Sequence, residues 1–232
     1  FMTCVDDVSD QKGAGVLLAG PCLVADCLFA FNTNRSYDAA GISVSHAGAV
    51  VENCTIVSNR CARWGGGVSV EAINGGTLRN CLIAWNYSPQ NGGGVSVYNA
   101  KPFLLNCTIV SNTAAISGGG LWYDQGGAQV SVTNCIVWNN KAPAGPDIYG
   151  TSGLFLPGYS CAFVLTNGVS GNITSPPAFR NATPGDVHLT RSSPCVNTGT
   201  NLPILVGGRD LEGNPRVVNL TVDMGAFEMP NL

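Results

Sequence analysis

The 232-residue sequence predicts an all-β protein folded as a right-handed parallel β-helix, because two motifs recur along it with one period. An Asn-Cys motif, seen as "VENCTIVSN" and "LLNCTIVSN", returns every 26–28 residues, and a glycine-rich motif, seen twice as "GGGVSV", keeps the same spacing. The chain has 30 Gly and only 11% charged residues, which favours short strands and many turns. Short repeats of this kind bury their apolar faces only by stacking on one another. We therefore expect about six coils of 26–28 residues.

Six cysteines mark the repeat and are expected to form a ladder in the core. They are Cys27, Cys54, Cys81, Cys107, Cys135 and Cys161. Apolar residues recur three positions before and two positions after each of them, which places these columns on the same buried face as the cysteines. A free cysteine behaves as a small hydrophobe, so packing is the favoured interpretation, with disulfides between neighbouring coils as the alternative.

Asparagines follow the same period and predict the corners of the coils. One column comes directly before most ladder cysteines, and a second consists of Asn32, Asn59, Asn86, Asn112 and Asn140. Asparagine tolerates the left-handed conformation that corners require. Its amide can also bond to identical side chains above and below it in the stack.

The chain divides into a repeated part and an irregular part. Residues 1–166 are expected to form the coils, and residues 167–232 a tail that packs on and caps the same domain. The tail holds a large share of the charges, namely Arg209, Asp210, Glu212, Arg216, Asp223 and Glu228. This pattern predicts an ionic network that fixes a loop and locks the last coil.

The outward side chains of the "CTIVSN" strands are unusually apolar. Val57, Leu82, Trp85, Val110, Ile136 and Trp138 are the candidate interface residues. A bare surface of this kind would be a liability, so something should cover it. The tail is one candidate and a neighbouring subunit is the other. The second choice predicts a homo-oligomer, such as a filament or layer at the cell surface.

The outward face of the "GGGVSV" strands is the candidate carbohydrate-binding surface. It presents Glu71, Tyr98, Trp122, Asp124 and Tyr149. Glu71 and Asp124 are two coils apart, or about 9.5 Å at the usual strand spacing, which suits the two carboxylates of an inverting glycosidase. No Lys or Arg joins this column and the acids do not repeat into a calcium cluster. Binding is therefore favoured over catalysis, with Glu71 and Asp124 as catalytic residues only in the enzymatic alternative.

The remaining cysteines and the sequons carry weaker signals. Cys4, Cys22, Cys61 and Cys195 lie outside the ladder and are the better disulfide candidates in an oxidising compartment. The sequence has no zinc-finger spacing, so we expect no metal and no cofactor. Sequons that the repeat does not generate begin at Asn34, Asn172, Asn181 and Asn219, which are the glycosylation candidates.

Two segments resemble known families. The glycine motif combined with "FAFN" at 29–32 resembles the GGA[ILV] and FxxN repeats of polymorphic outer-membrane proteins, although other coils have Ile or Val for Phe and GGGV for GGAI. The tail segments "GDVHLTRSSPCVNTGTN" and "DLEGNPRVVNLTVDMGAFE" resemble the end of secreted bacterial right-handed β-helix proteins of the choice-of-anchor Q type. The resemblance implies a secreted or cell-surface location and the same fold, but it implies little about chemistry.

Together these patterns predict an extracellular structural or adhesive module that self-associates and contacts glycans. The net charge of −3 and the lack of a basic stripe exclude a nucleic-acid footprint. No apolar run approaches the ~20 residues of a membrane span. The alternatives are a polysaccharide lyase or glycoside hydrolase, or a carbohydrate-binding module, either of which would use the face of the "GGGVSV" strands.

Overall fold

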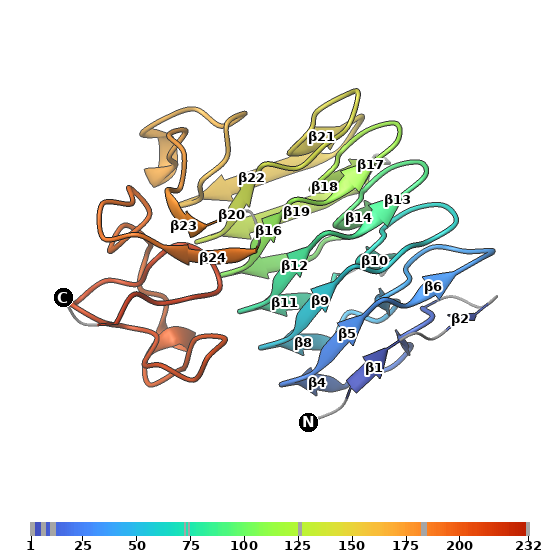
Figure 1. Ribbon diagram of the computed structural model, residues 1–232, viewed down its shortest axis with the longest axis horizontal. Helices are drawn as coiled ribbons and strands as arrows, with labels where there is room; N and C mark the ends of the chain where they lie inside the picture. Colours follow the sequence, from blue (N-terminus) through green and yellow to red (C-terminus); the bar gives the residue numbers. More distant parts are fainter. Residues whose placement is uncertain are drawn as a thin grey trace.

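The chain winds into a parallel β-helix whose coils stack in one direction (Figure 1). The computed structural model describes residues 3–5, 8–9, 13–71, 73, 75–124, 127–181 and 185–230. Three sheets run the length of the stack, and each contains six parallel strands, one from each successive coil. The predicted all-β fold is confirmed. The six strands of each sheet agree with the expected number of about six coils.

The three sheets are called the tail sheet, which the C-terminal tail covers, the glycine sheet, which follows the glycine runs, and the pocket sheet, which carries a surface pocket. The tail sheet consists of β1 (Thr3–Val5), β5 (Leu28–Ala30), β9 (Thr55–Val57), β12 (Leu82–Ala84), β16 (Thr108–Val110) and β20 (Ile136–Trp138). The glycine sheet consists of β3 (Val16–Leu18), β7 (Ile42–Val44), β10 (Val68–Val70), β14 (Val95–Tyr98), β18 (Leu121–Asp124) and β21 (Ile148–Gly150). The pocket sheet consists of β4 (Leu23–Ala25), β8 (Val50–Glu52), β11 (Thr77–Arg79), β15 (Phe103–Leu105), β19 (Gln129–Thr133) and β22 (Leu154–Gly158).

Smaller elements complete the chain. Two short parallel pairs lie at a corner of the coils, β2 (Val8–Ser9) with β6 (Thr33–Asn34), and β13 (Tyr87–Ser88) with β17 (Thr113–Ala114). After β22 come the 3-10 turn η1 (Val169–Gly171), the antiparallel hairpin of β23 (Phe179–Asn181) and β24 (Asp186–Leu189), and the 3-10 turn η2 (Pro203–Leu205). In Figure 1 the tail, drawn in orange and red, lies beside the coils rather than continuing the stack.

The core is a continuous column of small and branched apolar side chains. Cys54, Cys81, Cys107 and Cys135 are completely buried, and Cys27 is nearly so. Burial raises the pKa of the Cys81 and Cys135 thiols, because a thiolate would lose its hydration there. These thiols also donate to main-chain carbonyls, as Cys81 does to Arg79 O at 3.2 Å. The cysteines therefore act as packing residues whose thiol protons are satisfied.

Cys161 does not belong to this ladder, and its assignment to the core is wrong. The register pairs Cys161 with Ile136, which faces outward, and Ser160 occupies the rung beside Cys135. The final coil is short, because its two left-handed corners, Asn134 and Tyr159, are only 25 residues apart. Cys161 thus falls one position past the rung and points at the tail.

The asparagine columns have the predicted roles. Asn53, Asn80, Asn106 and Asn134 all have φ between 50° and 52°, the left-handed conformation that turns the chain from the pocket sheet to the tail sheet. The second column forms an unbroken ladder of amides from Asn32 to Asn140. Each amide oxygen accepts both the main-chain and the side-chain N–H of the coil before it, at 2.9–3.0 Å.

A proline in β22, the last strand of the pocket sheet, hinders pairing with a further strand. Inward-facing residues direct their peptide groups at the next coil, as Val44 O does when it accepts Glu71 N at 3.0 Å. In β22 that inward position is occupied by Pro157, which has no N–H to offer, and the Pro157 carbonyl accepts the Asn172 amide at 3.4 Å. Proline at a sheet edge is a common device against edge-to-edge association. The pocket sheet is therefore closed at this end.

Replacing a central ladder amide should be costly. Asn86→Ala removes the partners of Asn59, Ile56 O and Asn112 in a dry interior, so we expect the free energy of unfolding to fall by about 3–5 kcal/mol in denaturant titrations. Asn139→Ala is the control, since Asn139 is also left-handed but is exposed and makes one long bond, and about 1 kcal/mol is expected there. Equal losses in the two variants would contradict this role of the ladder.

Candidate functional site

The outward face of the glycine sheet has the predicted columns but not the predicted exposure. Ser69, Ser96, Trp122 and Tyr149 are in register on successive strands. Ser69 and Ser96 are 1% exposed and Trp122 is 3% exposed, because the loops that precede the glycine runs fold over this face. Trp122 therefore cannot offer its ring to a sugar, which corrects its assignment as a carbohydrate-binding residue.

Trp64 is the residue that covers this face, and the sequence analysis missed it. Its ring stacks on Tyr98 with 5.5 Å between ring centroids and lies against Trp122 at 5.6 Å. The Arg63 guanidinium lies over the Trp64 ring, 4.7 Å from its centroid. Trp64 is thus held between a cation and two other aromatic rings, and the cluster is packed rather than open.

A buried carboxyl holds the covering loop in place. Asp38 accepts the main-chain N–H of Trp64 at 3.1 Å and lies 3.9 Å from Arg63 Nε. Burial raises the pKa of Asp38, the hydrogen bond from Trp64 N and the charge of Arg63 lower it, and the nearby Glu71 carboxylate raises it further. Asp38 and Arg63 are on loops of adjacent coils, so only the stacking brings them together.

The two candidate catalytic acids lie in different surroundings. Glu71 contacts Asp38 and accepts the Ser69 hydroxyl at 3.4 Å. Asp124 accepts the hydroxyls of Thr151 and Ser152 from the loop that follows β21, the second at 3.0 Å. Tyr98 is in register between the two acids and Tyr149 is half-buried. Each acid is thus held by its own neighbouring loop.

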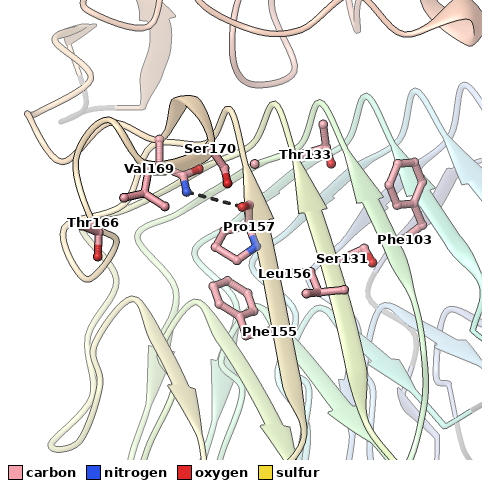
Figure 2. A pocket seen from close by; sticks show the side chains of 11 residues that line it. Phe103, Ser131, Thr133, Phe155, Leu156, Pro157, Thr166, Val169 and Ser170 are labelled. Carbon is pink, nitrogen blue, oxygen red and sulfur yellow. Dashed lines mark hydrogen bonds between the residues drawn. The ribbon is translucent and has the colours of Figure 1, made fainter.

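A concave site lies elsewhere, at the β22 end of the pocket sheet (Figure 2). Its volume is about 530 Å³, and its floor is the outward surface of β15, β19 and β22. The outward residues of these strands that line it are Phe103, Ser131, Thr133 and Leu156, and Thr166, Ser170 and Asn172 line it from the following loop. Phe155 also lines it, but its ring stacks on Tyr123 at the end of the core. In Figure 2, Thr166, Val169 and Ser170 lie on the loop that follows β22 and form one wall of the pocket.

The pocket combines apolar surface with neutral hydrogen-bonding groups. Phe103 and Leu156 supply outward apolar surface, and the hydroxyls of Ser131, Thr133, Thr166 and Ser170 supply donors and acceptors. None of its eleven lining residues is titratable. Sequence reasoning overlooked the pocket because its residues come from three coils and a loop, and no one of them belongs to a catalytic motif. The sequence indicated only that Phe103 and Ser131 are neighbours in one outward column, which places a ring beside a hydroxyl.

The apolar face of the tail sheet is covered by the chain's own tail. Leu82, Val110 and Ile136 are 1–8% exposed and Val57 and Trp138 are half-buried, because Val187, Leu189, Met224, Ala226 and Phe227 pack on them. Only Trp85, at 38% exposure, remains open among the candidate interface residues. The candidates therefore form an internal interface, and the tail takes the place that a second subunit would otherwise occupy.

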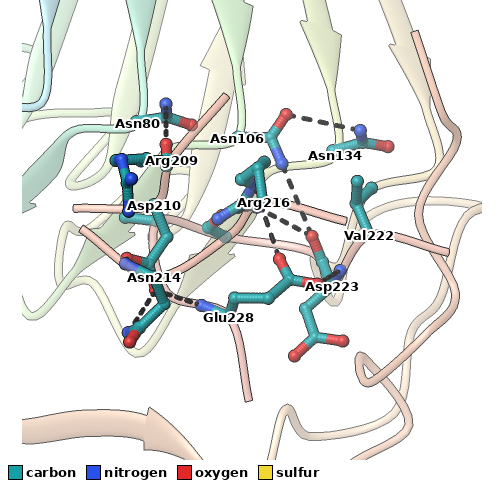
Figure 3. A network of polar contacts seen from close by, with 12 residues as sticks. Asn80, Asn106, Asn134, Arg209, Asp210, Asn214, Arg216, Val222, Asp223 and Glu228 are labelled. Carbon is teal, nitrogen blue, oxygen red and sulfur yellow. Dashed lines mark hydrogen bonds and ion pairs between the residues drawn. The ribbon is translucent and has the colours of Figure 1, made fainter. Parts of the chain in front are cut away.

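The corner asparagines anchor this tail, as Figure 3 shows. Asn80 donates to Arg209 O at 2.9 Å, and Asn134 exchanges two hydrogen bonds with Thr200, at 2.9 and 2.8 Å. Gly225 has φ of +94°, and a Cβ there would lie 2.7 Å from the Thr108 hydroxyl. Only glycine permits this close approach of tail and coil.

A buried ionic cluster organises the tail residues themselves. The Arg216 side chain is completely buried, donates to Asp223 O at 2.9 Å and to Gly225 O at 2.5 Å, and lies 3.5 Å from Glu228. Asp223 and Asp210 accept main-chain N–H groups of the same loop, including those of Asn197 and Glu228. Burial raises the pKa of Glu228 to about 8 despite the attraction of Arg216. The predicted network is present, and it fastens the tail alongside the coils.

Some of the predicted glycosylation and disulfide residues are buried and others are exposed. Asn34 and Asn172 are 1% and 4% exposed and use their amides within the fold, so the folded chain cannot present them to a glycosyltransferase, contrary to expectation. Asn181 and Asn219 are exposed. Cys22 is exposed, and Cys61 and Cys195 are buried, whereas the side chain of Cys4 lies outside the described residues. Burial raises the pKa of Cys61 to about 12.

The comparisons with known proteins agree with this architecture. Stacked parallel strands around a dry core define a parallel β-solenoid. The family described as "Right handed beta helix region" matches residues 7–174, and the chain belongs to that family. No curated protein and no solved structure matches the chain with significance. The coils, rather than the tail, carry the family signature.

Two further observations bear on partners. In the described part of the chain the helical elements are three-residue 3-10 turns, and none has the length or apolarity to cross a membrane. Across the same residues, no group of three or more His, Cys, Asp or Glu side chains is arranged to hold a metal ion.

The buried carboxyl of Glu228 predicts a pH dependence of stability. A folded-state pKa of about 8 for Glu228, against an ordinary glutamate pKa of 4.5, means that the folded chain keeps a proton which the unfolded chain has released. Stability should therefore fall as the pH rises from about 4.5 through 8 and then level off. Glu228→Gln should flatten this decline in unfolding titrations at pH 5, 7 and 9.

Glu52→Gln is the control, because it removes a carboxylate that is paired with Arg79 at 2.7 Å and does not belong to the Arg216 cluster. This variant should keep the native slope. A Glu228→Gln variant with the same slope as the native chain would contradict the assignment.

Proposed function

We propose that the chain is a non-enzymatic, extracellular adhesive module that binds a neutral glycan in the pocket at the end of the pocket sheet. The observation that supports this proposal is the pocket lining, which offers the Phe103 ring, several hydroxyls and no titratable group. Sugars bind through ring stacking and hydrogen bonds, which are the interactions that this lining supplies. A volume of about 530 Å³ is within the usual range of small-ligand sites and suits a short saccharide segment.

The same lining supports binding rather than turnover. Glycoside hydrolysis requires a pair of carboxyl groups, and general acid–base catalysis requires a titratable side chain near the scissile bond. The enzymatic alternative would rest on Glu71 and Asp124, outside the pocket. The aromatic ring expected between them, that of Trp122, is covered by Trp64. The extracellular location follows the resemblance of the repeats and the tail to secreted proteins.

Filling the pocket should abolish binding. Ser131 and Thr77 flank Phe103 in one outward column, but only Ser131 lines the pocket. We expect Ser131→Tyr to weaken binding of neutral oligosaccharides at least tenfold in calorimetric titrations, and Thr77→Tyr to leave binding unchanged. Glycan-array screening of the native chain identifies the oligosaccharide used.

Two results would contradict this proposal. One is the absence of any neutral oligosaccharide that the native chain binds, and the other is equal binding by the Ser131→Tyr variant. Release of product from a polysaccharide, abolished by Glu71→Gln or Asp124→Asn, would favour the enzymatic alternative instead.

Head-to-tail self-association is the second candidate, and the ends of the glycine sheet favour it. Its terminal strands, β3 and β21, belong to one parallel sheet, so a second copy stacked head-to-tail would extend that sheet in the correct strand direction. Leu17 on β3 is 46% exposed and Phe163 at the other end is 72% exposed. Pro157 closes the pocket sheet, and Cys161 and Ile173 continue the tail sheet only as isolated bridges, which favours the glycine sheet for the contact.

This predicts different effects of two otherwise similar changes. Leu17→Lys, on the terminal strand of the glycine sheet, should convert assemblies to the 24.0-kDa monomer in light scattering. Leu23→Lys, on the terminal strand of the pocket sheet, should leave the assemblies intact. A native chain that stays monomeric at high concentration would exclude self-association.

A further inference from the structure

The register shift in the last coil gives Cys161 a different neighbour from those of the ladder cysteines. Opposite Ile136, its side chain lies in the apolar cluster that joins the tail sheet to the tail, with Leu189, Cys195 and Met224. Its thiol donates to Ser175 O at 3.3 Å. Cys161 is completely buried, but on the outside of the coil rather than in the core.

Cys195 reaches the same cluster from the tail and is held firmly there. Its main-chain N–H donates to the Ser193 hydroxyl at 3.1 Å, and its carbonyl accepts Met224 N at 3.0 Å. Its side chain is completely buried. The neighbouring Cys195 thiol, together with burial, raises the pKa of Cys161. Two thiols 34 residues apart in the chain are therefore neighbours in one buried apolar cluster.

We propose that Cys161 and Cys195 form a disulfide that fastens the tail to the last coil. Each ladder thiol stands in a row of similar neighbours, whereas these two form an isolated pair between separate parts of the fold. The bond forms by thiol–disulfide exchange with a protein or small-molecule disulfide. Both thiols lose their protons, the S–S bond forms, and the incoming disulfide takes up the two electrons and leaves as two thiols.

Because both thiols are buried in the folded chain, the disulfide must form before folding is complete. A thiolate must reach the incoming disulfide, and neither sulfur is accessible once the tail has docked. The bond therefore forms while the tail folds onto the coils. Once formed, it is shielded from reductants by the same cluster. Because it closes a loop of 34 residues, it restricts the unfolded chain and opposes detachment of the tail.

Peptide mapping tests the bond directly. The full chain is refolded in a mixture of oxidised and reduced glutathione, alkylated after denaturation, and digested with trypsin without reduction. Cys161 is the only cysteine of the tryptic peptide 142–180, and Cys195 is the only cysteine of peptide 192–209. The expected product is these two peptides joined. Recovery of both peptides alkylated would overturn the proposal.

Thermal unfolding supplies the second measurement. Oxidation should raise the melting temperature of the native chain by about 5–15 °C, and Cys195→Ala should abolish this difference between oxidised and reduced samples. The matched control is Cys81→Ala in the ladder, which should lower both melting temperatures and keep the difference. A redox-dependent shift that persists in Cys195→Ala would assign it to another pair. Should Cys195→Ala fail to fold, the peptide map of the native chain still decides.

Discussion

The hydrogen bonds between successive coils are the constraint on which the rest of this structure depends. Each strand can pair only with the equivalent strand one coil away, so every position of one coil meets the same position of the next. Once that register is set, side chains fall into columns. The amides of Asn59, Asn86 and Asn112 then lie within hydrogen-bonding distance of one another without further adjustment. The buried polar ladder is thus a product of the backbone pairing and also makes a slip of the register costly.

The tail solves the problem that this regularity creates. A sheet face with Val110 and Ile136 pointing outward is too apolar to leave in water, and the tail buries it with its own apolar residues. The price of an irregular covering is a set of main-chain groups without strand partners. The side chains of Asp210 and Asp223 satisfy several of these, and Arg216 balances their charge in the dry interior. The polar cluster and the apolar cover are therefore parts of one arrangement.

Most of the fold could be predicted from the sequence, because the repeat reports directly on the stacking. The columns of Cys54 and Ile56, the left-handed corner at Asn53 and the ladder through Asn59 all follow from a period of about 27 residues. Prediction failed at Cys161, where the final coil is shorter and counting from the previous cysteine misplaces the residue by one position.

The surface was harder to predict, because exposure depends on loops that obey no period. Trp64 comes from a loop unlike those of the other coils, and nothing in "RCARWGG" indicates that its ring will cover Trp122. Asn34 and Asn172 have the sequence of glycosylation sites, yet their amides are used by the main chain around them. The pocket is made by a loop that returns to β22, so its lining exists only in three dimensions.

The corner asparagines also determine where the molecule can vary in length. Since neighbouring coils present nearly identical partners, a whole coil inserted or removed before Asn80 would leave every remaining ladder contact in place. Beyond that point the tail grips Asn80 and Asn134, which are two coils apart, through bonds whose spacing is fixed. The tail therefore fixes the distance along the stack between these two corners. It fixes the number of coils between Asn80 and Asn134, whereas the coils before Asn80 meet the tail through apolar packing, as at Val57.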